Sequence, residues 1–162
     1  MRSLLLHPHP DHGGDQHNNV IAALFAQLDQ PVRFDFHSSD LAACTAQVLT
    51  QLESGPAWLV GYSFGGAVAS LLDDPRVVGW FLIAPAVTMV DPVIGPDKRP
   101  KHVLTGARDA FFGAATLRQA TADWTFTTYD VVEGADHFFA GHEADVATRC
   151  RGWIAGAAQP PS

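Results

Sequence analysis

The chain has 162 residues, of which 47% are hydrophobic and 17% charged, and its formal net charge at pH 7 is −7. This composition predicts one globular domain with a substantial core. The acidic balance and the scattered lysines and arginines exclude a nucleic-acid-binding surface and disfavour strongly anionic substrates. No segment reaches the roughly 20 apolar residues of a membrane span, and the apolar start Met1–Leu6 is too short for a signal peptide. We therefore expect a cytoplasmic protein that binds neither membranes nor nucleic acid.

Two strands and a helix are predicted at the beginning of the chain. The apolar run Arg2–His7 predicts a strand, and His9–Asp15 predicts the loop after it. Apolar residues at helical spacing then predict a helix, and Pro31 ends this pattern before a second strand at Val32–Phe36. The apolar face of the helix consists of Val20, Ile21, Leu24, Phe25 and Leu28.

A second helix and a third strand follow. Ser38–Asp40 supplies residues that cap helix N-termini, and the helix after them extends towards Gly55–Pro56. Residues 57–60 then form an apolar strand, which leads directly into the glycine-rich turn Gly61–Gly66. One face of the second helix consists of Leu41, Cys44, Val48 and Leu52.

The second half of the chain predicts three more strands and a final helix. Strands are indicated at Val77–Ile83, from Lys101 onwards, and at Phe126–Val132. Residues 84–100 are rich in proline and lack helical periodicity, so we expect no sizeable cap between the first two of these strands. The last helix starts near Glu143. Its apolar face consists of Val146, Cys150, Trp153 and Ile154.

The alternation of strands with helices or long loops predicts an α/β fold. Right-handed crossovers make about six such strands a parallel sheet, with helices on both faces. We assign residues 1–156 to this single domain. Residues 157–162 hold small residues and prolines without core residues, so we expect a disordered tail there.

The two cysteines are expected to remain reduced. Cys44 and Cys150 fall on the apolar faces of two predicted helices. Free cysteine is among the residues most often found buried, so we expect buried thiols rather than a disulfide.

The turn Gly61–Gly66 has the pattern of a nucleophile elbow, G-x-S-x-G. In that turn a buried strand enters a helix so sharply that the serine adopts a strained backbone and exposes its hydroxyl. Gly61 and Gly65 flank Ser63 because a side chain at either position would collide with neighbouring backbone. Ser63 is therefore the candidate nucleophile. The alternative is an ordinary glycine-rich turn in which Ser63 caps the helix.

A serine nucleophile needs a general base and an acid that orients the base. Asp109 follows the strand that starts at Lys101, and His137 lies in the loop after the last predicted strand. Each of the three residues lies where a parallel strand ends, and serine, aspartate, histidine is an order in which catalytic triads occur along a chain. We predict that Ser63, Asp109 and His137 are catalytic.

The predicted acid and base have alternative interpretations. Asp109 is also a good cap for a helix that starts a few residues later. Asp91 is the second choice for the orienting acid. Asp136 is less suitable, because its side chain should point away from its immediate neighbour His137. His137 itself could be an ordinary histidine of a surface loop.

An oxyanion hole is also expected, because N–H donors stabilise the charged oxygen of a tetrahedral intermediate. The Phe64 N–H is one predicted donor, since it follows the nucleophile directly. The second donor should come from the loop after the first strand. Pro10 lacks an N–H, so the Asp11 N–H is our first choice and that of His12 the second.

Four segments together carry a resemblance to a known family. They are His7–Pro10 with Gly13–Gly14, the elbow Gly61–Gly66, the turn Gly106–Asp109, and Gly134–Phe139. The chain resembles a small α/β-hydrolase, close to the dienelactone-hydrolase-like group of compact bacterial serine hydrolases, over nearly its whole length. The resemblance implies a minimal α/β-hydrolase fold that lacks the first two antiparallel strands. Dienelactone hydrolases carry a cysteine at the elbow, so the serine of this chain does not imply their substrate chemistry.

The opening loop allows a second interpretation. His7–His12 fits H-x-H-x-D-H, the metal-binding string of metallo-β-lactamase-like hydrolases. Clustered imidazoles and a carboxylate could hold a zinc ion that activates water. That fold places several strands before the string and needs further ligands, whereas only six residues precede it here. We therefore expect no metal and no cofactor.

The sequence thus favours a serine hydrolase that cleaves a small ester or thioester through an acyl-enzyme. Its partners would be a small acyl substrate and water, and no oligomeric state is indicated. Without a cap, we expect an open cleft that prefers short acyl groups. Its expected lining is Phe64, Val87, Met89, Phe111, Phe112 and Phe138. The alternatives are a non-catalytic binding protein on the same fold and a metal-dependent hydrolase that uses His7–His12.

Overall fold

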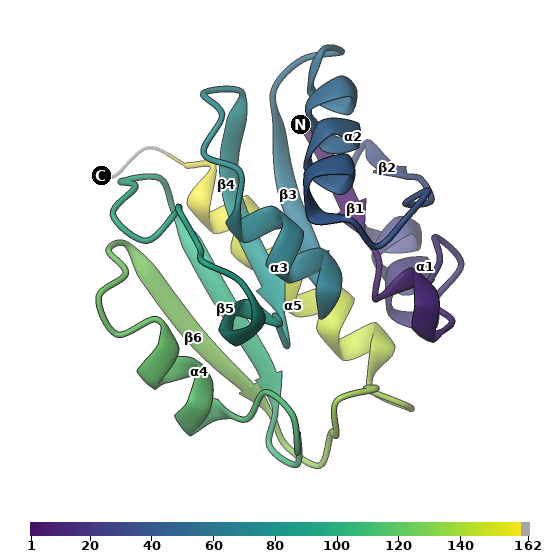
Figure 1. Cartoon of the computed structure of the whole chain (residues 1–162). Coiled ribbons are helices and arrows are strands. Elements are labelled where there is room, and N and C mark those ends of the chain that lie inside the picture. The colour runs from purple at the N-terminus through teal and green to yellow at the C-terminus, as the bar shows by residue number, and fades with distance from the viewer. Residues whose placement is uncertain (160–162) are drawn as a thin grey trace.

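The computed structural model describes residues 1–159, which form one parallel six-stranded sheet in the order β2-β1-β3-β4-β5-β6 (Figure 1). The strands are β1 (Arg2–Leu6), β2 (Pro31–Arg33), β3 (Ala57–Tyr62), β4 (Val77–Ile83), β5 (Lys101–Gly106) and β6 (Thr127–Val132). The helices are α1 (Asn19–Gln27), α2 (Leu41–Leu52), α3 (Phe64–Ser70), α4 (Ala114–Ala120) and α5 (Glu143–Ala157). Two short 3-10 helices are η1 (Pro10–His12) and η2 (Val87–Met89).

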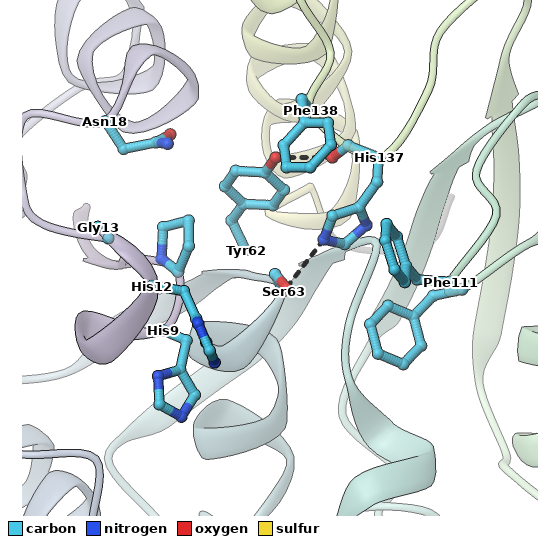
Figure 2. Close-up of a pocket in the computed structure, with 12 residues that line it drawn as sticks. His9, His12, Gly13, Asn18, Tyr62, Ser63, Phe111, His137 and Phe138 are labelled. Atoms are coloured by element: carbon cyan, nitrogen blue, oxygen red, sulfur yellow. Dashed lines mark hydrogen bonds between the residues drawn. The ribbon is translucent and has the colours of Figure 1, made fainter.

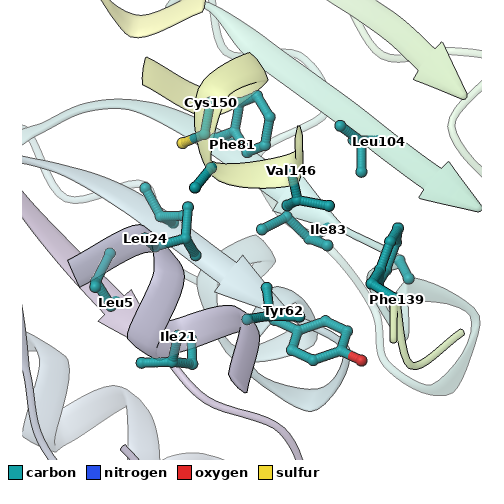
Figure 3. Close-up of a cluster of buried hydrophobic side chains, with 14 of the residues drawn as sticks. Leu5, Ile21, Leu24, Tyr62, Phe81, Ile83, Leu104, Phe139, Val146 and Cys150 are labelled. Carbon is teal, nitrogen blue, oxygen red and sulfur yellow. The ribbon is translucent and has the colours of Figure 1, made fainter. Parts of the chain in front are cut away.

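Helices cover both faces of the sheet, as predicted. The helices α1 and α5 lie on one face, and α2, α3 and α4 lie on the other (Figure 1). Successive side chains of a strand point to opposite faces, so Leu5 packs under α1 and α5 while Leu4 and Leu6 pack under α2 and α3. The first of these layers is shown in Figure 3, where Leu24 of α1 and Cys150 of α5 belong to one buried cluster with Phe81 of β4. Burial on both faces explains why every residue of β3 is buried.

The second strand is shorter than predicted. The structure limits β2 to Pro31–Arg33, which pairs with Ser3–Leu5 of β1. Because β1 ends at Leu6 rather than His7, the backbone of Phe36 has no strand partner. Its N–H instead donates to His7 Nε2 at 2.9 Å. The side chain of His7 thus supplies the hydrogen bond that a longer strand pair would have given to Phe36.

The sheet reverses its strand order between β1 and β3. The chain passes from β1 outwards to β2, and later strands add on the other side of β1. Loops that leave two neighbouring parallel strands in opposite directions open a crevice at their carboxyl ends, which is where ligands bind in such sheets. The loop after β1 and the turn after β3 therefore face each other across this crevice.

The connection at residues 84–100 contains only the short η2, in agreement with the predicted lack of a cap. Helix α5 continues to Ala157, one residue into the expected tail, and residues 160–162 of that tail lie outside the described part of the chain.

Cys44 and Cys150 are buried free thiols, as expected. Among residues 1–159, no helix has both the length and the apolar character needed to cross a membrane.

His102 of β5 generates a prediction about acid stability. Its ring stacks on Phe81 with centroids 4.8 Å apart, and Nδ1 lies 2.7 Å from Thr128 Oγ1. Burial lowers the pKa of His102 from 6.5 to about 4, although the charge of Asp130 opposes this shift. Between these values the unfolded chain binds a proton that the folded protein does not bind. Acid therefore favours the unfolded state through this group, by up to about 3 kcal/mol.

We expect His102→Gln, which cannot take up that proton, to reduce this acid sensitivity. As the pH falls from about 7 to about 4.5, the free energy of unfolding should decrease more for the wild-type protein than for the variant. Urea denaturation of both proteins across this range measures the difference. A difference that stays constant with pH would contradict a buried, neutral His102.

Candidate active site

Ser63 occupies a strained turn between β3 and α3. Its backbone has φ 54° and ψ −112°, a conformation that non-glycine residues adopt only where the surrounding structure enforces it. A Cβ at Gly65 would overlap the carbonyl oxygen of Leu6 on β1, and a Cβ at Gly61 would overlap that of Gly65. The predicted steric role of both glycines is therefore confirmed. The close contact with β1 places the N-terminus of α3 against the loop that leaves β1.

The structure brings Ser63, His137 and Asp109 together from three different strand ends. Ser63 Oγ lies 3.1 Å from His137 Nε2 (Figure 2). On the other side of the ring, His137 Nδ1 lies 2.8 Å from Asp109 Oδ2. A carboxylate accepts only from Nδ1–H, so Nε2 of a neutral ring is the atom left to accept from the Ser63 hydroxyl. This is the arrangement that activates a serine.

Asp109 serves two purposes at once. Its Oδ1 accepts the N–H groups of Phe111 at 2.8 Å and Phe112 at 2.7 Å, while Oδ2 faces His137. The capped segment is this turn and not α4, whose N-cap is Gly113. Burial favours the neutral acid, but the hydrogen bonds from His137, Phe112 and Phe111 outweigh it and lower the pKa of Asp109. Asp109 therefore stays ionised beside the imidazole.

Neither alternative acid contacts the imidazole through its carboxylate. Asp91 is exposed on the loop after β4. Asp136 turns away from its neighbour, as expected, because its Oδ1 accepts the Phe138 N–H at 2.9 Å.

Sequence reasoning missed Tyr62, the last residue of β3. Its hydroxyl donates to the carbonyl oxygen of His137 at 2.6 Å, and the tyrosine is 3% exposed. Burial raises the pKa of this phenol, so it remains a donor at neutral pH. The bond ties the loop that carries His137 to the strand that carries Ser63. No local pattern in the sequence indicates this contact, because it joins segments far apart in the chain.

A cleft of about 420 Å³ opens above Ser63 (Figure 2). One side is formed by the loop after β1, and the other by the loops after β5 and β6. The lining residues of the loop after β1 are Pro8, His9, His12, Gly13, Gly14 and Asn18. The aromatic lining residues on the opposite side are Phe111, Phe112 and Phe138, as predicted.

Three of the expected lining residues lie elsewhere. Phe64 is 8% exposed and packs edge-on against Phe36, in the core under α2 and α3. Val87 is buried with Leu117 of α4. Met89 is 76% exposed but does not border the cleft. The loop after β1 forms more of the cleft wall than the sequence predicts, in keeping with its position at the reversal of strand order.

The structure does not leave the Asp11 N–H free for an oxyanion. This N–H donates to His9 Nδ1 at 3.1 Å, and that of His12 donates to His9 O at 3.1 Å, because Pro10–His12 folds into η1. The His9 N–H has no acceptor within the described part of the chain. Phe64 is the first residue of α3, so its N–H has no acceptor in a preceding helical turn.

The string His7–His12 does not gather into a ligand set. His7 Nε2 accepts the Phe36 N–H, and Nδ1 lies 2.6 Å from Pro8 O. Asp11 Oδ2 accepts the hydroxyl of Ser39 at 2.7 Å. Within residues 1–159, no three His, Cys, Asp or Glu side chains lie close enough together to hold a metal ion.

The contact between Gly65 and β1 can be tested with a matched pair of variants. Gly65→Ala should lower the free energy of unfolding by about 1–3 kcal/mol, because the new methyl group overlaps backbone that cannot move freely. Gly152→Ala in α5 meets open space and should be neutral or stabilising by up to about 1 kcal/mol. Urea denaturation measures both. Equal stability of Gly65→Ala and wild type would contradict the close approach.

Comparisons with known proteins agree with this architecture. The model of the family described as "Alpha/beta hydrolase family" matches residues 9–160. An alpha-beta serine hydrolase homologue from Coxiella burnetii is 23% identical with a TM-score of 0.83, over 95% of this chain and 85% of its own. XC6422 from Xanthomonas campestris, described as a serine hydrolase without lid, is 23% identical with a TM-score of 0.75, over 99% and 84%. Est1E from Butyrivibrio proteoclasticus is 13% identical with a TM-score of 0.81, over 96% and 87%. No curated protein matches the chain.

Proposed function

The chain belongs to the alpha/beta hydrolase family, and we propose that it is a serine hydrolase that cleaves small esters or thioesters through an acyl-enzyme. One observation carries this proposal. A continuous hydrogen-bond path runs from Ser63 Oγ through the imidazole of His137 to Asp109. A non-catalytic binding protein would have no need for this path or for the strained backbone of Ser63.

The reaction follows from the positions of these atoms. His137 Nε2 takes the hydroxyl proton while Ser63 Oγ attacks the carbonyl carbon of the substrate, and ionised Asp109 stabilises the imidazolium. The tetrahedral intermediate collapses when His137 returns the proton to the leaving oxygen or sulfur. Water then attacks the acyl-enzyme with the same assistance. This second attack releases the acid and restores Ser63.

We assign the oxyanion hole to the N–H groups of Phe64 and His9 in place of Asp11. The two segments that carry these groups are in contact, because Gly65 of α3 lies against Leu6 and His7 at the end of β1. The dipole of α3 adds favourable potential for a negative oxygen at this position. Each donor aimed at such an oxygen contributes on the order of 10²–10³ in rate.

The shape of the cleft favours small substrates. A volume of about 420 Å³ is near the lower end for small-molecule sites, and no cap encloses the site between β4 and β5. The absence of a lid is also stated for XC6422. We place the chain near the dienelactone-hydrolase-like group on the resemblance of its opening loop, with serine in the position of that group's cysteine.

We also propose a cytoplasmic location. Cys44 and Cys150 are free and buried, and thiols persist in reducing compartments. Burial raises the pKa of both thiols, so they are unreactive and play no part in the chemistry.

Substitution of the nucleophile tests the proposed function. Ser63→Ala should lower kcat for phenyl acetate by roughly 10³–10⁶ without loss of folded structure, because the acyl-enzyme cannot form. Ser70→Ala is the control, since it removes a buried hydroxyl from the other end of α3 that donates only within the helix. Steady-state hydrolysis assays and circular dichroism measure both effects. A Ser63→Ala rate within about tenfold of wild type would exclude Ser63 as the nucleophile.

A further inference from the structure

Asn18 is held in one orientation by the first turn of α1. Its Oδ1 accepts the N–H groups of Val20 at 2.9 Å and Ile21 at 3.4 Å, as is typical of an asparagine at a helix N-cap. An NH₂ group in that position would face two N–H donors. The carbonyl end of the amide is therefore fixed towards the helix, and Nδ2 must point away from it.

The Nδ2 group of Asn18 is an unused donor on the wall of the cleft. Asn18 lines the cleft and is partly buried. Figure 2 shows its amide at the end of a side chain that extends towards the open space above Ser63. Within residues 1–159, Nδ2 donates to no acceptor. The Oδ1 of the same amide, by contrast, accepts two N–H groups of the helix cap. A donor held in this way is available to a substrate without a cost of reorientation.

The position of the general base decides which part of a substrate meets Asn18. His137 must return its proton to the leaving atom, so the leaving group lies on the side of Ser63 that holds His137 and Phe111. Asn18 and Gly13 lie on the opposite side of Ser63 (Figure 2). The carbonyl oxygen points to the Phe64 and His9 N–H groups assigned above, so the acyl chain is the substituent that remains. It passes the part of the loop after β1 that carries Asn18, which lies apart from His9 in Figure 2.

We propose that Asn18 is a specificity-determining residue whose Nδ2–H donates to a neutral oxygen on the acyl chain of the substrate. This inference rests on the proposed serine hydrolase function and names its substrate class, esters or thioesters of oxygen-substituted acids. The acceptor oxygen lies beyond the reacting carbonyl, towards α1. The leaving group meets the aromatic side of the cleft and needs no polar partner there.

Pairs of 4-nitrophenyl esters test this inference. Each pair consists of a simple straight-chain acyl ester and the same ester with a keto group on the fourth, fifth or sixth carbon. The measured quantity is the ratio of kcat/KM for the keto ester to that for its parent. Comparing this ratio between variants cancels the intrinsic reactivity of each ester.

Asn18→Asp retains an oxygen that caps α1, because aspartate caps as well as asparagine does. The substitution replaces the Nδ2–H donor with a carboxylate oxygen, so the keto oxygen of the substrate no longer has a hydrogen-bond donor at residue 18. The ratio should fall about tenfold for the keto position that reaches residue 18. Asn19→Asp adds the same charge to the exposed neighbouring residue, which does not line the cleft, and should leave every ratio within about twofold of wild type.

Two contrary outcomes are distinguishable. If folded Asn18→Asp hydrolyses the esters with every ratio unchanged, the inference is overturned and the proposed function stands. If the wild-type protein hydrolyses none of the esters, the proposed function fails and the inference fails with it. Thermal melting of Asn18→Asp, which should match wild type within a few degrees, confirms that the cap is retained.

Discussion

The candidate active site depends on one constraint, which is that the carboxyl ends of parallel strands meet at one edge of a sheet. Ser63, Asp109 and His137 follow β3, β5 and β6, so strands far apart in sequence deliver all three to the same edge. The reversal of strand order between β1 and β3 adds a crevice at this edge. Apolar helices on both faces hold the strands in register, and the chemistry can then be placed in loops.

Close backbone contacts convert this general arrangement into a specific geometry. Gly65 allows α3 to touch β1, which brings the N-terminus of α3 and the loop after β1 together beside Ser63. Tyr62 ties the loop of His137 to β3, and Asp109 bonds its own turn as well as the imidazole. His137 and Asp109 are thus each held by a second contact, which keeps both side chains aligned with Ser63 without a bound substrate.

Features with a local physical cause were predictable from the sequence. The buried strands are continuous apolar runs, and the elbow has a steric requirement for glycine, so both were found without tertiary information. Features set by distant partners were not found. The Phe36 N–H has its acceptor in the side chain of His7, and the Asp11 N–H has its acceptor in the ring of His9. The cleft wall at Asn18 likewise depends on distant partners, because α1 is held in place by its packing against β1, β2 and α5.

The central claim is that His137 and Asp109 activate Ser63, and the intact mass of protein treated with a fluorophosphonate tests it most directly. Such probes phosphonylate a serine only where a general base and an oxyanion hole are assembled around it. The account predicts that the wild-type protein gains the mass of a single phosphonyl group and that Ser63→Ala gains none. Folded wild-type protein that remains unlabelled, or equal labelling of the two proteins, would contradict it.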